Sequence, residues 1–205
     1  MVSPDEPHRR FAQKRRRFVW TPRGPIPGEA FCPRTALPVF SPRGVVQTRR
    51  HNSEDSMAST LIVYGSTTGN TGYMAEAIGR VLGAAGHTVT VKDVAGVDAD
   101  GLCADYDVCV FGSSTWGDDE IELQDDFADF LGDMDKTGVK GKKTAAFGPG
   151  DSSYTHFCGA VDAISEKLTE LGAAPVIDGL KIDGDPRSEQ AEIESWAKDL
   201  LNAIG

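Results

Sequence analysis

The chain has 205 residues, which fits one ordinary α/β domain together with a further segment. Its formal net charge of −10 divides unevenly: residues 1–56 carry eleven Lys or Arg against five Asp or Glu, and residues 57–205 carry ten against twenty-six. The acidic part is expected to repel nucleic acid and anionic membranes, and no apolar run approaches the ~18 residues that a membrane-spanning helix needs.

Residues 1–56 have the composition of a disordered, basic extension. They hold eight of the eleven prolines and ten arginines, without a sustained helical or strand period. Two interpretations stay open. The segment is either a genuine extension, such as an organelle transit peptide, or an upstream reading-frame product with the true start at Met57. The second is favoured because Met57 leads directly into the first predicted strand.

From Thr60 onward, short apolar strands alternate with amphipathic helices. Strands are predicted at 61–64, 88–91, 108–111, 144–147 and near 175–177. The intervening helices are predicted from apolar faces within 74–85, 123–134 and 158–171. A last helix is predicted with Asp185 as its N-cap, Pro186 at its first position, and a buried face from Ile193 to Ile204. Residues 57–205 are therefore expected to form one α/β domain with a parallel sheet covered on both faces.

The loop after the first predicted strand has the composition of a phosphate site. Residues 65–71 read GSTTGNT, which supplies hydroxyls, one amide and two glycines next to a helix N-terminus. The loop lacks the lysine of a nucleoside-triphosphate loop and does not match the GxGxxG pattern. An uncharged cradle suits a phosphate monoester held without a metal, and the alternative is a strand–helix turn that binds nothing.

Two further loops, after the third and fourth predicted strands, each carry an aromatic ring among polar residues. Trp116 lies beside glycine and acids, and Tyr154 follows a run of Gly, Asp and Ser. Large rings in polar loops are unusual, and stacking on a planar ligand is the interpretation we favour. Because the carboxyl ends of parallel strands meet at one edge, the three loops predict a site for a flat phosphorylated heterocycle, best matched by FMN.

These motifs resemble the short-chain flavodoxins of sulfate-reducing bacteria. The resemblance rests on residues 61–71, 114–119, 150–164 and 178–186, and residues 1–56 have no counterpart in it. It implies a flavodoxin-like, doubly wound three-layer α/β/α fold with a five-stranded parallel sheet of order 2-1-3-4-5. It also implies a low-potential one-electron carrier with non-covalently bound FMN, rather than an enzyme.

The resemblance assigns a role in FMN binding to each matching position. The phosphate would be held by Ser66, Thr67, Thr68, Gly69, Asn70 and Thr71, and the ring would lie between Trp116 and Tyr154. The surroundings of the ring would come from Ser114, Thr115, Gly117, Asp118, Pro149, Gly150, Asp151, His156, Phe157 and Cys158. Two positions depart from the family pattern: Pro149 stands where a cysteine is frequent, and His156 replaces a common aromatic.

The expected partners are redox proteins with basic docking patches, steered by the acidic surface. A monomer without nucleic-acid or membrane partners is expected. The four cysteines form no CxxC pair, which favours a reducing, cytoplasmic location. The alternative function is an FMN-dependent quinone or NAD(P)H reductase, which would need a substrate pocket over the ring.

Overall fold

A parallel sheet forms the centre of the computed structural model, which describes residues 57–117 and 120–205. Its order is β2 (Thr88–Asp93), β1 (Ser59–Gly65), β3 (Val108–Ser113), β6 (Lys143–Gly150). Two short strands, β7 (Ala174–Pro175) and β8 (Leu180–Asp183), share the fifth position and both pair with β6 in parallel. The predicted order 2-1-3-4-5 is confirmed, with its last strand divided in two.

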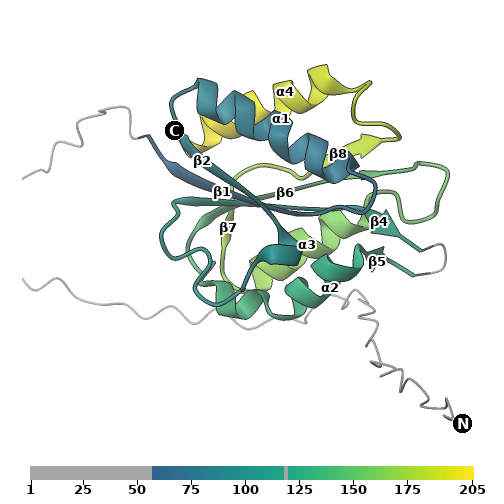
Figure 1. Cartoon of the computed structure of the whole chain (residues 1–205), viewed down its shortest axis with the longest axis horizontal. Coiled ribbons are helices and arrows are strands. Elements are labelled where there is room, and N and C mark those ends of the chain that lie inside the picture. Colours follow the sequence, from purple (N-terminus) through teal and green to yellow (C-terminus); the bar gives the residue numbers. More distant parts are fainter. Residues whose placement is uncertain (1–56, 118–119) are drawn as a thin grey trace, which may run out of the picture.

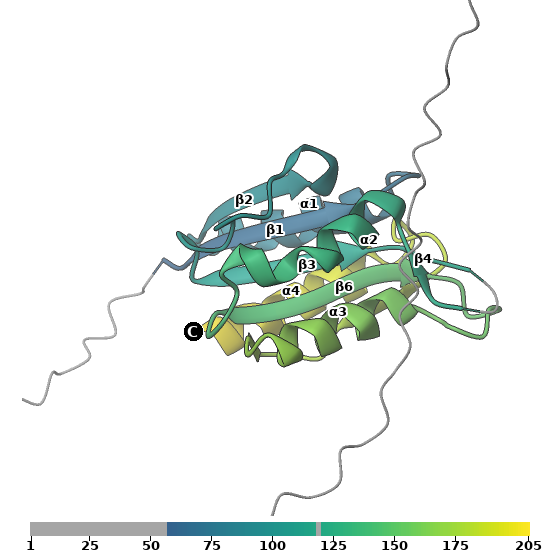
Figure 2. The same ribbon diagram turned by 90° about the horizontal axis from the view of Figure 1, so that it is seen from below.

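Helices cover both faces of this sheet (Figures 1 and 2). Helices α1 (Asn70–Ala84) and α4 (Gln190–Ile204) lie on one face, and α2 (Asp125–Gly132) and α3 (Gly159–Glu170) lie on the other. Two single-turn 3-10 helices, η1 (Val94–Gly96) and η2 (Met134–Thr137), fill connections. A small antiparallel pair, β4 (Thr115–Trp116) with β5 (Glu122–Leu123), stands beside the main sheet.

Alternate residues of the central strands feed two separate hydrophobic cores. Leu61 and Val63 of β1 pack with the α2 and α3 side chains, whereas Ile62 between them packs with α1 and α4. All six residues of β3 are buried. A strand covered on both faces reads as a continuous apolar run, and for this reason the sequence located these strands well. Within the described residues, no helix is long and apolar enough to cross a bilayer.

The predicted start of the last helix is wrong. Helix α4 begins at Gln190, with Glu189 as its N-cap residue, instead of at Pro186. The Asp185 carboxylate accepts a hydrogen bond from the Arg187 backbone N–H at 3.0 Å, and the Asp185 carbonyl accepts one from the Ser188 hydroxyl at 2.7 Å. The Ser188 and Glu189 N–H groups also bond three residues back, to the Asp185 and Pro186 carbonyls, so these residues form a turn, and the first bond of α-helical spacing runs from the Ile193 N–H to the Glu189 carbonyl. Arg187 therefore stands in a loop.

The predicted extension, residues 1–56, lies outside the described residues. The predicted helix across 123–134 is shorter than expected, because Leu123 belongs to β5 and Met134 opens the separate turn η2.

Candidate functional site

The loops that follow β1, β3, β6 and β8 surround one cavity at the carboxyl ends of the strands. Its volume is about 520 Å³, within the usual range of a small-molecule site. The lining residues are Thr68, Asn70, Ser114, Thr115, Trp116, Gly117, Pro149, Gly150, Asp151, Tyr154, His156 and Gly184. Asp151 supplies the one carboxylate among these described lining residues, which include no Lys or Arg.

The loop between β1 and α1 is shaped to leave the helix N-terminus open to an anion. Gly69 precedes the helix with φ of 86°, a conformation that favours glycine, and its N–H donates to Ser66 Oγ at 3.0 Å. No side chain caps α1, and its first turn contains no acid. The first N–H groups of the helix and its positive dipole end are thus available to a negative group.

Thr71, in the first turn of α1, carries a buried hydroxyl beside the open helix N-terminus. Its side chain is 1% exposed, and its Oγ1 has no hydrogen-bond partner among the described residues. A buried hydroxyl without a partner is unfavourable, so structures nearly always satisfy it. A phosphate oxygen bound at this helix N-terminus would supply the acceptor.

The second loop presents Trp116, whose side chain is 45% exposed at the cavity. Its indole Nε1–H donates to Ser114 Oγ at 2.9 Å, which holds the ring orientation. Thr115 Oγ1 accepts from the Ala160 N–H at 3.0 Å and ties this loop to α3. Gly117 has φ of 87°, and a Cβ there would lie 2.3 Å from the Glu120 carbonyl oxygen. The adjoining predicted residue, Asp118, lies outside the described residues.

The third loop presents Tyr154, which is 51% exposed. Asp151 Oδ1 accepts from the Ser153 hydroxyl at 2.6 Å and from the Ser153 backbone N–H at 2.9 Å, and these hydrogen bonds hold the pKa of the Asp151 carboxyl below its usual range. Ser152 N–H donates to Asp183 Oδ1 at 2.9 Å, so the end of β8 anchors the loop. The loop that carries the second ring is therefore braced by two carboxylates.

Cys158 shapes the site without reactive chemistry of its own. It is fully buried, stands at the N-cap of α3 with φ of 50°, and lies close to the Gly148 carbonyl at 3.5 Å. Burial raises the pKa of its thiol to about 12, so it stays protonated at neutral pH. A Cβ on Gly150 would lie 2.7 Å from Cys158 Sγ, which explains why glycine is needed there.

Most of the predicted site residues line the cavity. Six do not line it but lie within two positions of a lining residue in the chain: Ser66, Thr67, Gly69, Thr71, Phe157 and Cys158. Pro149 lies buried in β6, opposite Ile182 of β8. Gly184 lines the cavity and was missed by the sequence analysis. Its N–H donates to the Gly150 carbonyl at 2.8 Å. Because glycine has no side chain, nothing in the sequence indicated that this residue lies at the cavity.

The fold and the cavity together define a class: a doubly wound α/β protein whose site pairs an anion-ready helix N-terminus with two exposed aromatic rings. Comparisons with known proteins agree with that class. The family model for flavodoxin matches residues 62–196. The flavodoxin of Nitratidesulfovibrio vulgaris (strain Miyazaki F) is 55% identical over 148 residues, which cover 72% of this chain and all of that protein. The flavodoxin of Maridesulfovibrio salexigens is 49% identical over the same shares.

Solved structures show the same architecture. Oxidised flavodoxin 2 from Bacillus cereus superposes with a TM-score of 0.63 and 38% identity, covering 72% of this chain and 97% of its own. Oxidised flavodoxin 1 from the same organism gives a TM-score of 0.64 with 33% identity, over 71% and 98% of the two chains. The chain belongs to the flavodoxin family.

Proposed function

We propose that this protein is a low-potential electron carrier that binds one FMN non-covalently in the cavity and passes single electrons between redox proteins. The observation that carries the proposal is the joint presence of an open helix N-terminus and two exposed rings around one cavity. Family membership supports it.

The residues present fit FMN. Thr71 offers an unsatisfied buried hydroxyl at the helix N-terminus, which matches a phosphate. The loop that precedes it is uncharged, so a phosphate would be bound by hydrogen bonds and the helix dipole. Trp116 and Tyr154 offer aromatic surface for a flat ring system, and the cavity volume of about 520 Å³ suits a ligand of this class.

When bound, FMN supplies the one-electron chemistry, and the side chains around it would tune its reduction potential. Trp116 and Tyr154 exclude water from the ring faces, which strengthens electrostatic effects there. The acidic side chains disfavour added negative charge: two charges ~15 Å apart interact by about 1 kcal/mol at an effective dielectric near 20. Several acids acting together would lower the potential at which the ring accepts its second electron.

The acidic surface also defines the partner class. Residues 57–205 carry ten basic against twenty-six acidic side chains, so we propose docking by basic redox proteins over the exposed edges of Trp116 and Tyr154. Transfer rates should then fall as salt is added. We propose a monomer that works in a reducing, cytoplasmic setting.

The proposal is tested by titrating the apoprotein with FMN and following flavin fluorescence, then by a spectroscopic redox titration of the complex. Saturable one-to-one binding and two separated one-electron steps are expected. A protein that refuses FMN would overturn the proposal. Steady turnover of NAD(P)H or a quinone by the isolated protein would replace it with the reductase alternative.

A matched pair of variants tests the electrostatic part. One variant neutralises the acids of the Trp116 loop, and the control neutralises three acids at the other end of the sheet. The loop variant carries Asp118→Asn, Asp119→Asn and Glu120→Gln, and the control carries Asp100→Asn, Asp105→Asn and Asp135→Asn. The second-electron potential should rise in the first variant by more than in the control. Equal shifts would contradict the electrostatic account.

A further inference from the structure

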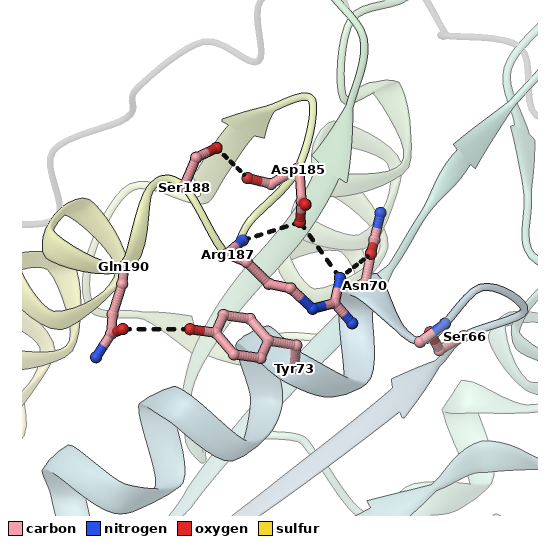
Figure 3. Close-up of polar contacts among 8 residues, drawn as sticks. Ser66, Asn70, Tyr73, Asp185, Arg187, Ser188 and Gln190 are labelled. Carbon is pink, nitrogen blue, oxygen red and sulfur yellow. Dashed lines mark hydrogen bonds and ion pairs between the residues drawn. The ribbon is translucent and has the colours of Figure 1, made fainter.

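Arg187 brings a positive charge to the phosphate loop from a distant part of the chain. It lies in the turn between β8 and α4, 117 residues after Asn70, yet its Nη1 donates to Asn70 Oδ1 at 2.8 Å (Figure 3). Asn70 is the first residue of α1 and lines the cavity. The loop at residues 65–71 is uncharged, but its surroundings are not.

Several contacts hold the guanidinium in place. Its Nη1 lies 3.2 Å from Asp185 Oδ1, and its Cζ lies 5.3 Å from the centre of the Tyr73 ring, one turn beyond Asn70 on α1. The Tyr73 hydroxyl donates in turn to Gln190 Oε1 at 3.4 Å. A long surface side chain is thus fixed by a carboxylate, an aromatic face and an amide together (Figure 3).

The hydrogen bond to Arg187 determines which end of the Asn70 side-chain amide is available to a ligand. A guanidinium only donates, so it must take the amide oxygen. Figure 3 shows Oδ1 facing Arg187 while the amide nitrogen points away from it. The NH₂ group, with two donors, then remains for an acceptor. Rotated by half a turn, the same amide would turn its oxygen toward an anion and repel it.

The charge of Arg187 does not by itself explain this arrangement. Asp185 pairs with the same nitrogen and offsets much of the positive charge. The remaining effect of Arg187 is on orientation, because its guanidinium selects one of the two orientations of the Asn70 side-chain amide. In the proposed complex this directional effect would act on the phosphate group alone, since the ring would lie between Trp116 and Tyr154.

We infer that Arg187 is a positioning residue, which fixes the Asn70 side-chain amide so that its NH₂ group donates to the phosphate of the ligand. The inference rests on the proposed function, since the phosphate is that of FMN. It adds a determinant outside the loop: selectivity for a phosphorylated flavin over riboflavin depends on a side chain contributed by the turn before α4.

The first test compares Arg187→Ala with wild type in binding FMN, riboflavin and inorganic phosphate. Affinity for FMN should fall on the order of tenfold, the lower end of the effect of one hydrogen bond to a charged group. Phosphate should lose affinity similarly, and riboflavin should bind unchanged. Arg80→Ala is the control, because it removes an equal charge from an exposed position on α1. An equal loss for riboflavin, or in the control, would overturn the inference.

A double-mutant cycle tests whether Arg187 acts through Asn70. Asn70→Ala should weaken FMN binding, and adding Arg187→Ala to it should cause no further loss. A full additional loss in the Asn70→Ala background would overturn the positioning role, because Arg187 would then act on the phosphate directly. In wild type, the Asn70 side-chain NH₂ resonances should shift when inorganic phosphate is added, and in Arg187→Ala they should shift less.

Different results would refute FMN binding and the role of Arg187. Wild-type protein that does not bind FMN would refute the proposed function. Wild-type protein that binds FMN, with Arg187→Ala binding it equally well, would refute the inference alone.

Discussion

Replacing Thr71 by Val should stabilise the apoprotein and weaken FMN binding, two effects of opposite sign from one substitution. Thr71 Oγ1 is buried and has no partner among the described residues. Leaving a buried hydroxyl unsatisfied costs about 1–3 kcal/mol in protein mutational data. Valine has the same branched shape and a similar helix propensity, so the apoprotein should gain about 1 kcal/mol.

The loss on the binding side follows from the same atom. If Thr71 Oγ1 donates to the phosphate of FMN, the variant loses a hydrogen bond to a charged group, worth about 1.5–3 kcal/mol. At 1.4 kcal/mol per factor of ten, the dissociation constant should rise roughly 10- to 150-fold. Urea unfolding of the apoprotein measures the first effect, and quenching of flavin fluorescence measures the second.

The chain offers two matched controls for this experiment. Thr60 in β1 and Thr144 in β6 are also fully buried, and their hydroxyls also have no partner among the described residues. Both lie near the start of their strands, at the end of the sheet opposite the cavity. Thr60→Val and Thr144→Val should therefore stabilise the apoprotein without changing FMN affinity. If Thr71→Val behaves like these controls, its hydroxyl does not face the phosphate and the reasoning is refuted.

Three further effects follow from named contacts. Trp116→Ala should weaken FMN and riboflavin binding alike, by about tenfold, because stacking surface is lost from the ring and not from the phosphate; fluorescence titration measures both. Gln124→Ala should lower the free energy of unfolding by about 1 kcal/mol in urea, since Gln124 Oε1 accepts from the Phe127 N–H and caps α2. Asp107→Asn should flatten the loss of stability in acid, measured by urea unfolding from pH 5 to pH 2.

The sign of the Asp107 effect follows from its partner. Hydrogen bonds from the backbone and hydroxyl of Ser59 hold the pKa of the Asp107 carboxyl below its ordinary value. Its contribution is present above the unfolded pKa of about 3.9 and is lost as pH falls through the lower folded value. An unchanged acid slope in Asp107→Asn would contradict this assignment, and an unchanged urea midpoint in Gln124→Ala would contradict the capping role.

The central strands were predictable because strands that are buried on both faces consist of continuous apolar residues. Val108 to Phe111 form an unbroken apolar run, and the structure buries every residue of β3. The fifth strand leaves a weaker mark. Its two segments are short, and Pro175 removes a backbone donor from the first of them, so a continuous run never develops.

The site was predictable where side chains differ in kind from their surroundings. Trp116 and Tyr154 were found because large rings are rare in polar loops. Gly184 was missed because it contributes a backbone turn with φ of 71° and no side chain. Its place at the cavity depends on β8 lying beside β6, a contact between segments about thirty residues apart that no local pattern records.

The wrong helix start and the unnoticed arginine have one physical cause. Asp185 followed by Pro186 matches the usual opening of a helix, and a helix starting there would have placed Arg187 in its first turn. The Asp185 carboxylate does accept from the Arg187 N–H, as an N-cap would, and it also pairs with the Arg187 guanidinium. The Ser188 and Glu189 N–H groups, however, bond three residues back to the Asp185 and Pro186 carbonyls, so the chain forms a turn before α4 begins at Gln190, and Arg187 reaches Asn70 from this turn. The orientation of the Asn70 amide, which lines the cavity, therefore depends through Arg187 on the hydrogen bonds of Asp185, and Asp185→Asn should shift the Asn70 side-chain NH₂ resonances.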